Sequence, residues 1–96
     1  MKIIKLLPLV GEFAENKDIA RDIRIKQIIP FLGNREQVAV DFSGISSATQ
    51  SFIHALISDL IRKYDTDLFD LLLFKNCSPN VKGIINIVVD YMLERD

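Results

Sequence analysis

A run of small polar residues lies between an apolar stretch and a helical pattern in the middle of this 96-residue chain. It extends from Asp41 to Phe52, and its candidate partner- or anion-binding residues are Ser46, Ser47, Thr49, Gln50 and Ser51. When such a run ends a parallel strand and opens a helix, it lies where open α/β sheets usually bind ligands. The free N–H groups and positive dipole end of a helix start suit an anion or a phosphorylated side chain.

The same residue types also suit a purely structural role. Ser, Thr and Gly are common at any strand-to-helix turn, and composition alone favours capping over ligand binding. We expect the Asp41 carboxylate to accept hydrogen bonds from the N–H groups of residues 44–46 and, with Gly44, to structure the turn. We expect Phe52 to anchor the helix start in the core and Gln50 to be an exposed contact residue.

The sequence gives little support to nucleophilic catalysis. His54 follows Ser51 by three residues, which brings the two side chains near each other on a helix, but no Gly-x-Ser-x-Gly elbow is present. Cys77 precedes an expected helix start, which can lower a thiol pKa; a partly buried, inert cysteine is nevertheless the favoured interpretation. No glycine-rich phosphate-loop motif occurs. We therefore expect no enzyme activity and no catalytic residues.

Metal and cofactor sites are not expected either. A single His and a single Cys disfavour a zinc site. Asp65, Asp67 and Asp70 have a spacing that suggests a hard cation, but the glycine and terminal Glu of a calcium loop are missing. The favoured interpretation is that these carboxylates are solvated turn residues, and the sequence predicts no metal and no cofactor.

Charge and hydropathy narrow the class of partner. Twelve Lys and Arg against thirteen Asp and Glu give a net charge of −1, which argues against a nucleic-acid binder or a polybasic membrane module. No apolar run approaches the ~20 residues that span a bilayer, and Lys5 interrupts the apolar start where a signal peptide would be continuous. One cysteine excludes an intramolecular disulfide. We expect a single domain over residues 1–96, in the cytoplasm.

Strand-like and helical runs alternate along the chain. Short apolar runs at 3–7, 38–42 and 69–74 predict strands. Asn16 or Asp18 is expected to cap the first helix, Ser46 or Ser47 the second, and Ser78 the third, with Pro79 at its first position. Pro30 is expected to end or kink the first helix.

Each helical run carries an apolar face at i, i+3, i+4 and i+7 spacing. In the first helix this face is Ile25, Ile28, Ile29 and Leu32; in the second it is Ile53, Leu56, Ile57, Leu60 and Tyr64; in the third it is Val81, Ile84, Ile85, Val88 and Met92.

The order β-α-β-α-β-α predicts an α/β fold with a small, three- to four-stranded, mostly parallel sheet and right-handed crossovers. If the strands lie in chain order, both crossover helices cover one face and leave the other open. Alternatively, the last helix crosses to cover the second face, and the sequence gives both arrangements equal weight. An open face or edge on so small a sheet predicts a partner.

One stretch resembles a known family. The sequence VAVDFSGISSATQSF at 38–52 is similar to the central motif of the bacterial STAS-like domain of unknown function: an apolar strand, Asp-Phe, a small residue with Gly, a short spacer and Ser-Phe. The stretch DIARDIR at 18–24 resembles the first-helix pattern of that family, and FKNCSPNVKGII at 74–85 resembles its last strand-to-helix junction. The resemblance implies a STAS-like fold.

The motif is also similar to the STAS domains of anti-sigma-factor antagonists. In those domains a partner kinase, an ATPase of the histidine-kinase-like fold, phosphorylates a serine at the helix start and breaks a protein complex. The resemblance places Asp41, Gly44 and Ser51 on the matching positions and makes Ser51 the candidate phosphoacceptor. The chain departs from the antagonist motif Asp-Ser-Ser-Gly with Thr-Gln-Ser-Phe at 49–52.

Together these features predict a non-enzymatic interaction and regulatory module. It would bind a protein partner through the helix start, with a histidine-kinase-like ATPase as the candidate partner and phosphorylation of Ser51 as the candidate switch. The alternatives are a domain that binds a small ligand or an anion such as a nucleotide or phosphate, and a module that forms a homodimer. Neither nucleic acid nor membrane is an expected partner.

Overall fold

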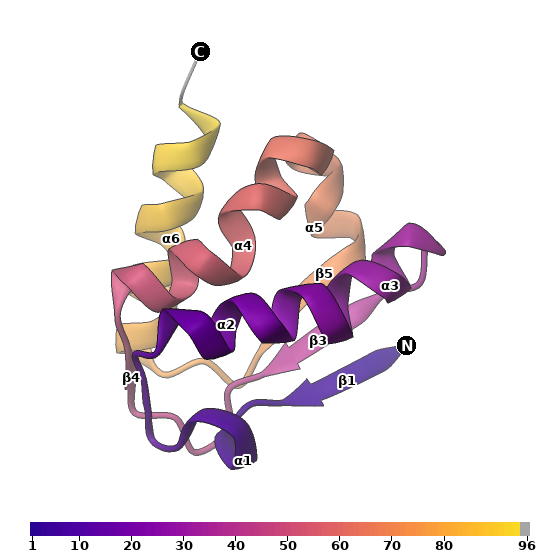
Figure 1. Cartoon of the computed structure of the whole chain (residues 1–96). Helices are drawn as coiled ribbons and strands as arrows, with labels where there is room; N and C mark the ends of the chain where they lie inside the picture. Colours follow the sequence, from indigo (N-terminus) through magenta and orange to yellow (C-terminus); the bar gives the residue numbers. More distant parts are fainter. Residues whose placement is uncertain (95–96) are drawn as a thin grey trace.

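A computed structural model describes residues 1–94 (Figure 1). Its three main strands and its longer helical segments follow the expected β-α-β-α-β-α order, with short unpredicted strands and helices between them. The elements are β1 (Lys2–Lys5), α1 (Leu7–Val10), β2 (Phe13–Ala14), α2 (Lys17–Ile23), a π-helical turn (Arg24–Ile28), α3 (Ile29–Gly33), β3 (Val38–Asp41), β4 (Ser47–Ala48), α4 (Gln50–Tyr64), a 3-10 turn (Asp65–Asp67), α5 (Leu68–Leu71), β5 (Leu72–Lys75) and α6 (Pro79–Leu93).

Three parallel strands form the main sheet in the order β1-β3-β5, with β3 in the centre. In the register, Ala39 of the central strand pairs with Ile3 on one side and with Leu73 on the other, and in the next row Val40 pairs with Ile4 and with Phe74. A second, two-stranded parallel sheet pairs β2 with β4. This arrangement confirms the expected α/β fold with a small parallel sheet.

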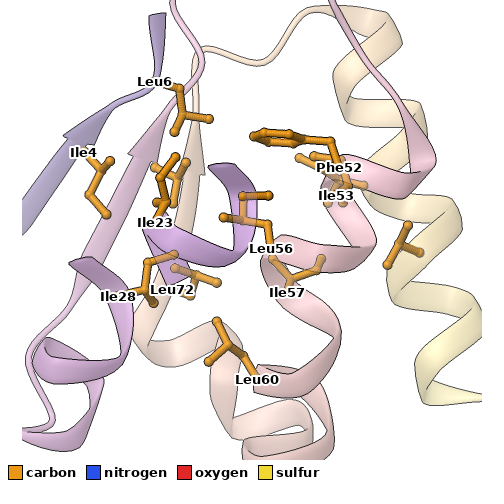
Figure 2. Close-up of a cluster of buried hydrophobic side chains, with 14 of the residues drawn as sticks. Ile4, Leu6, Ile23, Ile28, Phe52, Ile53, Leu56, Ile57, Leu60 and Leu72 are labelled. Atoms are coloured by element: carbon orange, nitrogen blue, oxygen red, sulfur yellow. The ribbon is translucent and has the colours of Figure 1, made fainter. Parts of the chain in front are cut away.

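The long helices lie on one face of the main sheet. Figure 1 shows α2 and α4 side by side, with α6 beside α4. The helix α6 packs against both α4 and β4. The buried side chains between this layer and the sheet form one hydrophobic core (Figure 2). Its largest fully buried members are Phe42, Phe52, Ile4, Leu6, Ile28, Leu32, Ile53, Leu56, Ile57, Leu68, Leu72 and Val38.

The last helix belongs to that same layer. Val81, Ile85 and Val88 of α6 are buried in the common core. On the opposite face of the sheet, Ile3 is 56% exposed. Of the two arrangements expected, the structure has the one in which all the long helices cover the same face of the sheet. No helix within residues 1–94 covers the other face.

The apolar face expected for the first helix is partly wrong. Ile28 and Leu32 are buried, but Ile25 is 49% and Ile29 40% exposed. The cause is the π-helical turn, in which the N–H of Ile29 donates to the carbonyl of Arg24, five residues back. The wider turn shifts the phase of the buried face. Of the two expectations for Pro30, an end or a kink of the helix, the first is wrong, because α3 begins at Ile29 with Pro30 in its first turn.

The outer two strands are displaced from their expected positions. β1 ends at Lys5, and residues 7–10 form the short helix α1. The last strand begins at Leu72 rather than Phe69, because residues 68–71 form α5. Leu68 and Leu71 are both buried, and their separation of three residues is a helical spacing. The faces predicted for the two longer helices are confirmed, with Tyr64 and Ile84 half-buried.

Candidate functional site

The candidate site forms where the central strand ends and α4 begins. The last backbone bond of the main sheet in this region runs from the N–H of Phe42 to the carbonyl of Lys75, at 2.9 Å. The chain then turns away through residues 43–46, pairs briefly as β4, and enters α4 at Gln50. The expected boundary of the central strand near residue 42 agrees with this course.

Thr49 caps α4. Its backbone is extended, and its Oγ1 accepts a hydrogen bond from the N–H of Phe52 at 3.0 Å. The expected caps, Ser46 and Ser47, are wrong. Ser47 and Ala48 instead pair with Phe13 and Ala14 as the second small sheet, which delays the helix start.

Ser46 and Ser47 are joined to the rest of the molecule through their backbone. The N–H of Ser46 donates to the carbonyl of Glu12 at 2.9 Å, and its own carbonyl accepts from the hydroxyl of Ser78 at 2.9 Å. The side-chain amide oxygen of Asn80 accepts from the N–H of Ala48 at 3.2 Å. Residues 46–48, which lead into α4, are thus hydrogen-bonded both to the segment before α2 and to the start of α6.

Asp41 fixes the turn through donors other than those expected. Its carboxylate accepts from the N–H of Ser43 at 2.9 Å and from the side-chain amide of Asn76 at 3.0 Å. The N–H groups of Ile45 and Ser46 are engaged elsewhere, with the carbonyls of Phe42 and Glu12. The Asn76 amide, followed by Ser43, lowers the pKa of Asp41 below its usual value, and Lys5 adds to the effect.

Gly44 sits at the tip of this turn with a φ of 81°. A Cβ added there would lie 2.7 Å from Cδ2 of Leu7 in α1. The positive φ favours glycine at this position, whereas the exposed Leu7 side chain could move away from a Cβ. This contact places α1 directly against the polar loop, which we define as residues 43–46.

Ser51 and Phe52 occupy neighbouring positions with opposite environments. Phe52 is fully buried in the core (Figure 2), whereas Ser51 is exposed. Ser51 lines a shallow, open depression of about 470 Å³ between the first turns of α2 and α4, together with Lys17, Gln50, His54 and Ala55. Figure 1 shows these two helices starting at the same end of the molecule.

The chemistry available in this depression suits an anion. The first turn of α4 carries the positive end of a fifteen-residue helix, and Lys17 supplies an ammonium group on the facing helix. Within residues 1–94, the Ser51 hydroxyl makes no hydrogen bond, since Thr49 provides the cap. His54 is exposed on the same helix face.

Two residues that the sequence reasoning missed belong to this region, Lys17 and Asn76. Lys17 opens α2 and borders the Ser51 depression. Asn76 directly follows β5 and reaches Asp41 at the end of β3. The carboxyl ends of parallel strands meet at one edge of a sheet, so the position of Asn76 just after an expected strand was the available signal.

Cys77 lies apart from the Ser51 depression. It is half-buried and borders a cavity of about 340 Å³ lined by Phe74, Asn76, Lys82, Ile85 and Asn86. Burial raises the pKa of its thiol, Asp41 adds to the rise, and Lys82 opposes it. A raised pKa lowers the fraction of the thiol that is present as the reactive thiolate.

The acidic residues after α4 are not gathered into a metal site. Asp65 and Asp67 lie in the 3-10 turn and Asp70 in α5, all three exposed. Across the part of the chain that the structure describes, no three His, Cys, Asp or Glu side chains are placed to hold a metal ion together. No helix within residues 1–94 has both the length and the apolar character needed to cross a bilayer.

Comparison with known families agrees with the motif at 38–52. A family model described as a STAS-like domain of unknown function matches residues 20–82, which include β3, the polar loop and all of α4. The chain therefore belongs to this STAS-like family, as the resemblance predicted. Neither a curated protein nor a solved structure matches the chain.

Proposed function

We propose that this member of the STAS-like family is a non-enzymatic interaction and regulatory module, which binds a protein partner through the first turn of α4 and the neighbouring strand ends. The observation that carries the proposal is the position of Ser51. Its hydroxyl is exposed in the first helical turn, while Thr49 caps the helix and Phe52 anchors it. A charge can therefore be added at Ser51 without disturbing a cap or the core.

Phosphorylation of Ser51 is the proposed switch. A phosphate adds about −1.5 to −2 charge at pH 7. In the free protein this charge is well placed, because it meets the N–H groups of the helix start and the Lys17 ammonium. Inside a packed interface the same charge would have to lose its water, which is costly. Phosphorylation would then release the partner while the fold stays intact.

The proposed partner is an ATPase of the histidine-kinase-like fold. The support is the similarity of the 38–52 motif to that of the anti-sigma-factor antagonists, whose kinases have this fold. The polar loop, the exposed Gln50 and the exposed Ser51 provide the contact surface on this side. The proposed location is the cytoplasm, where such a kinase and its ATP would be found.

The same depression favours one alternative, the binding of a small anion such as a nucleotide or phosphate between Lys17 and the α4 start. A thermal-shift series separates the two functions, because a bound ligand raises stability with the logarithm of its concentration. A rise with phosphate or ATP that is lost in Lys17→Gln would favour the ligand-binding function. Unchanged melting across the series would favour the protein partner.

The first experiment maps phosphorylation in cells that express the protein natively. Tryptic cleavage after Arg35 and Arg62 yields one peptide over 36–62, with no Lys or Arg between. This peptide also contains Ser43, Ser46, Ser47, Thr49 and Ser58, so fragment ions must localise the site. Phosphate on Ser51 would support the proposal, whereas phosphate confined to another residue, or none in any growth condition, would contradict the switch.

A further inference from the structure

The strand β5 forms one edge of the main sheet. It pairs with β3 on one side, and no other strand within residues 1–94 pairs with it. The carbonyl of Lys75 accepts from the N–H of Phe42, so the backbone groups of Lys75 point towards the β3 side. Because successive residues of a strand direct their backbone groups to opposite sides, the N–H and carbonyl of Phe74 point away from the sheet. Together with the Leu72 carbonyl, they form a row of backbone groups with which a further strand can pair.

The other edge of the sheet, β1, is less suited to such pairing. Lys2 and Lys5 stand at its two ends, and charged residues, lysine above all, are common on edges that proteins protect from pairing. The strand β5 instead presents three apolar residues, 72–74, before its single charged residue, Lys75. Figure 1 shows β1 and β5 on opposite sides of β3. Of the two edges, β5 is therefore the better acceptor of an added strand.

A cavity of about 340 Å³ lies beside this edge, between the end of β5 and the first turns of α6. On the strand side it is lined by Phe74, which is half-buried and packs against the core. On the helix side it is lined by Lys82 and Asn86, and Val89 continues their stripe one turn further along α6. A strand that pairs with β5 would lie about 4.8 Å from it, so its alternate side chains would enter this cavity.

The charge of the cavity favours an acidic occupant. Lys82 forms no ion pair within the described residues, and among those residues no carboxylate lines the cavity. Asp41 raises the pKa of the Cys77 thiol, but its carboxylate already accepts hydrogen bonds from Ser43 and Asn76. A carboxylate on an added strand would meet Lys82 in a partly enclosed site, where salt screens a charge pair less than on an open surface.

We propose that β5 and α6 together bind an extended segment of a partner protein, which adds to β5 as a fourth strand and places an acidic side chain against Lys82. Main-chain hydrogen bonds to the edge would provide affinity, and the cavity would select the alternate side chains, as in other proteins that bind peptides by strand addition. A second copy of β5 fits less well, because its sequence, Leu-Leu-Phe-Lys, has no acidic residue and would bring a further lysine. This inference goes beyond the function proposed for Ser51 and does not rest on it, because the cavity shares no residue with the Ser51 depression.

A random dodecapeptide library displayed on phage is the probe. Selection against the full chain should enrich peptides that combine β-branched residues with an acidic residue. A selected peptide is then synthesised with a fluorescent label, and its Kd is measured by fluorescence anisotropy. Lys82→Glu should raise this Kd at least about tenfold. Lys5→Glu makes the same change of charge on the opposite edge strand, serves as the matched control and should leave the Kd within about twofold.

A change in the peptide keeps the test independent of protein folding. Replacing the acidic residue of the peptide by its amide should weaken binding to the wild type, but should cost much less with Lys82→Glu, because the charge pair is already lost. Circular dichroism should show that Lys82→Glu and Lys5→Glu remain folded, since both lysines are exposed.

Hydrogen exchange measured by NMR tests the strand addition itself. The N–H of Phe74 points out from the free edge, so the bound peptide should slow its exchange at least about tenfold, while the N–H of Lys75 should change little. A selection that enriches no peptide, a Kd that Lys82→Glu leaves unchanged, or protection of β1 in place of Phe74 would overturn the proposal. Sedimentation velocity should show a monomer without peptide. A dimer in which Phe74 is already protected would also overturn the proposal, since a second copy would then occupy the edge.

Discussion

Neighbouring side chains in the first turn of α4 have separate roles, and single substitutions should separate them. Thr49→Ala removes the hydroxyl that accepts from the N–H of Phe52, so it should lower the free energy of unfolding by about 1 kcal/mol. Ser51→Ala removes an exposed hydroxyl and should change it by less than about 0.5 kcal/mol. Urea unfolding monitored by circular dichroism measures both.

Thr49→Ser is the matched control, because it keeps a capping hydroxyl and should retain most of the stability. If Ser51→Ala destabilised the protein as much as Thr49→Ala, the Ser51 hydroxyl would be part of the fold. It would then be unsuited to reversible modification.

The contribution of Asp41 to the stability of the protein depends on pH. Its pKa in the folded protein is lowered from the usual 3.8, mainly by the Asn76 amide and then by Ser43. The stability that this carboxylate contributes is therefore complete above the unfolded-state pKa and is lost as the pH falls through the lower, folded-state pKa. The advantage of the wild type over Asp41→Asn should shrink as the pH is lowered from neutrality through this range.

NMR titration of the Asp41 carboxyl group tests the cause directly. Asn76→Gly removes the amide and still tolerates the φ of 59° at this position, so it should raise the pKa of Asp41 towards 3.8. An unchanged titration curve would show that the Asn76 contact does not govern this carboxylate.

At the scale of single residues, local chemistry in the sequence predicted much of the site. The motif placed Asp41, Gly44 and Ser51 at the junction, and Phe52 was expected to anchor the helix start in the core, where the structure has it. The donors to Asp41 were not predictable from the loop alone, because the N–H groups of Ile45 and Ser46 are taken by the carbonyls of Phe42 and Glu12. Those bonds depend on the tertiary fold, which residue spacing does not specify.

Among the elements, the segment from α2 to α3 offers the clearest test of the π-helical turn. Ile25→Lys and Ile29→Lys place charges at exposed positions and should each change the free energy of unfolding by less than about 0.5 kcal/mol. Ile28→Ala empties a fully buried position and should cost about 2–5 kcal/mol. Chemical denaturation of the three variants distinguishes this pattern from a regular helix, which would bury Ile25 and Ile29 as well.

The elements also show where periodicity succeeds and where it fails. The face of α4 was predictable because fifteen regular residues repeat one spacing. The π-helical turn was not predictable from the spacing of apolar residues. A single wide turn changes which residues face the core, and no residue in it signals the change. β4 was not predictable either: its two residues pair only because β2 lies alongside, and two residues carry no periodicity.

The one-sided layering of the whole molecule is testable on two adjacent residues of β1. Ile4 is 2% exposed and faces the helices, whereas Ile3 is 56% exposed on the open face. Ile4→Ala should therefore cost about 2–5 kcal/mol. Ile3→Thr keeps a β-branched side chain and should cost less than about 1 kcal/mol. Comparable losses at both positions would mean that the second face is covered.

The sequence predicted the parallel sheet but left the position of the last helix open. Strand–helix–strand units determine the direction of the strands and the hand of each crossover. The crossover rule applies to a helix between two strands, and residues 1–94 contain no strand after α6, so the rule does not determine the face that α6 covers. Its face was decided by packing: its buried residues share one core with those of α4, which left Ile87 and Tyr91 on the outside.

The most direct test of the proposed function is the affinity of the native partner for the wild type and for matched charge variants. The partner is first captured from native cells with the wild-type chain, identified and purified, and its binding is then measured by isothermal titration calorimetry. Ser51→Asp adds one negative charge in the first turn of α4, and Lys63→Gln makes the same change in net charge near its other end. We predict that Ser51→Asp weakens binding at least about tenfold with an unchanged melting temperature, while Ser51→Ala and Lys63→Gln bind as the wild type does. Equal affinity of Ser51→Asp and the wild type would contradict the account.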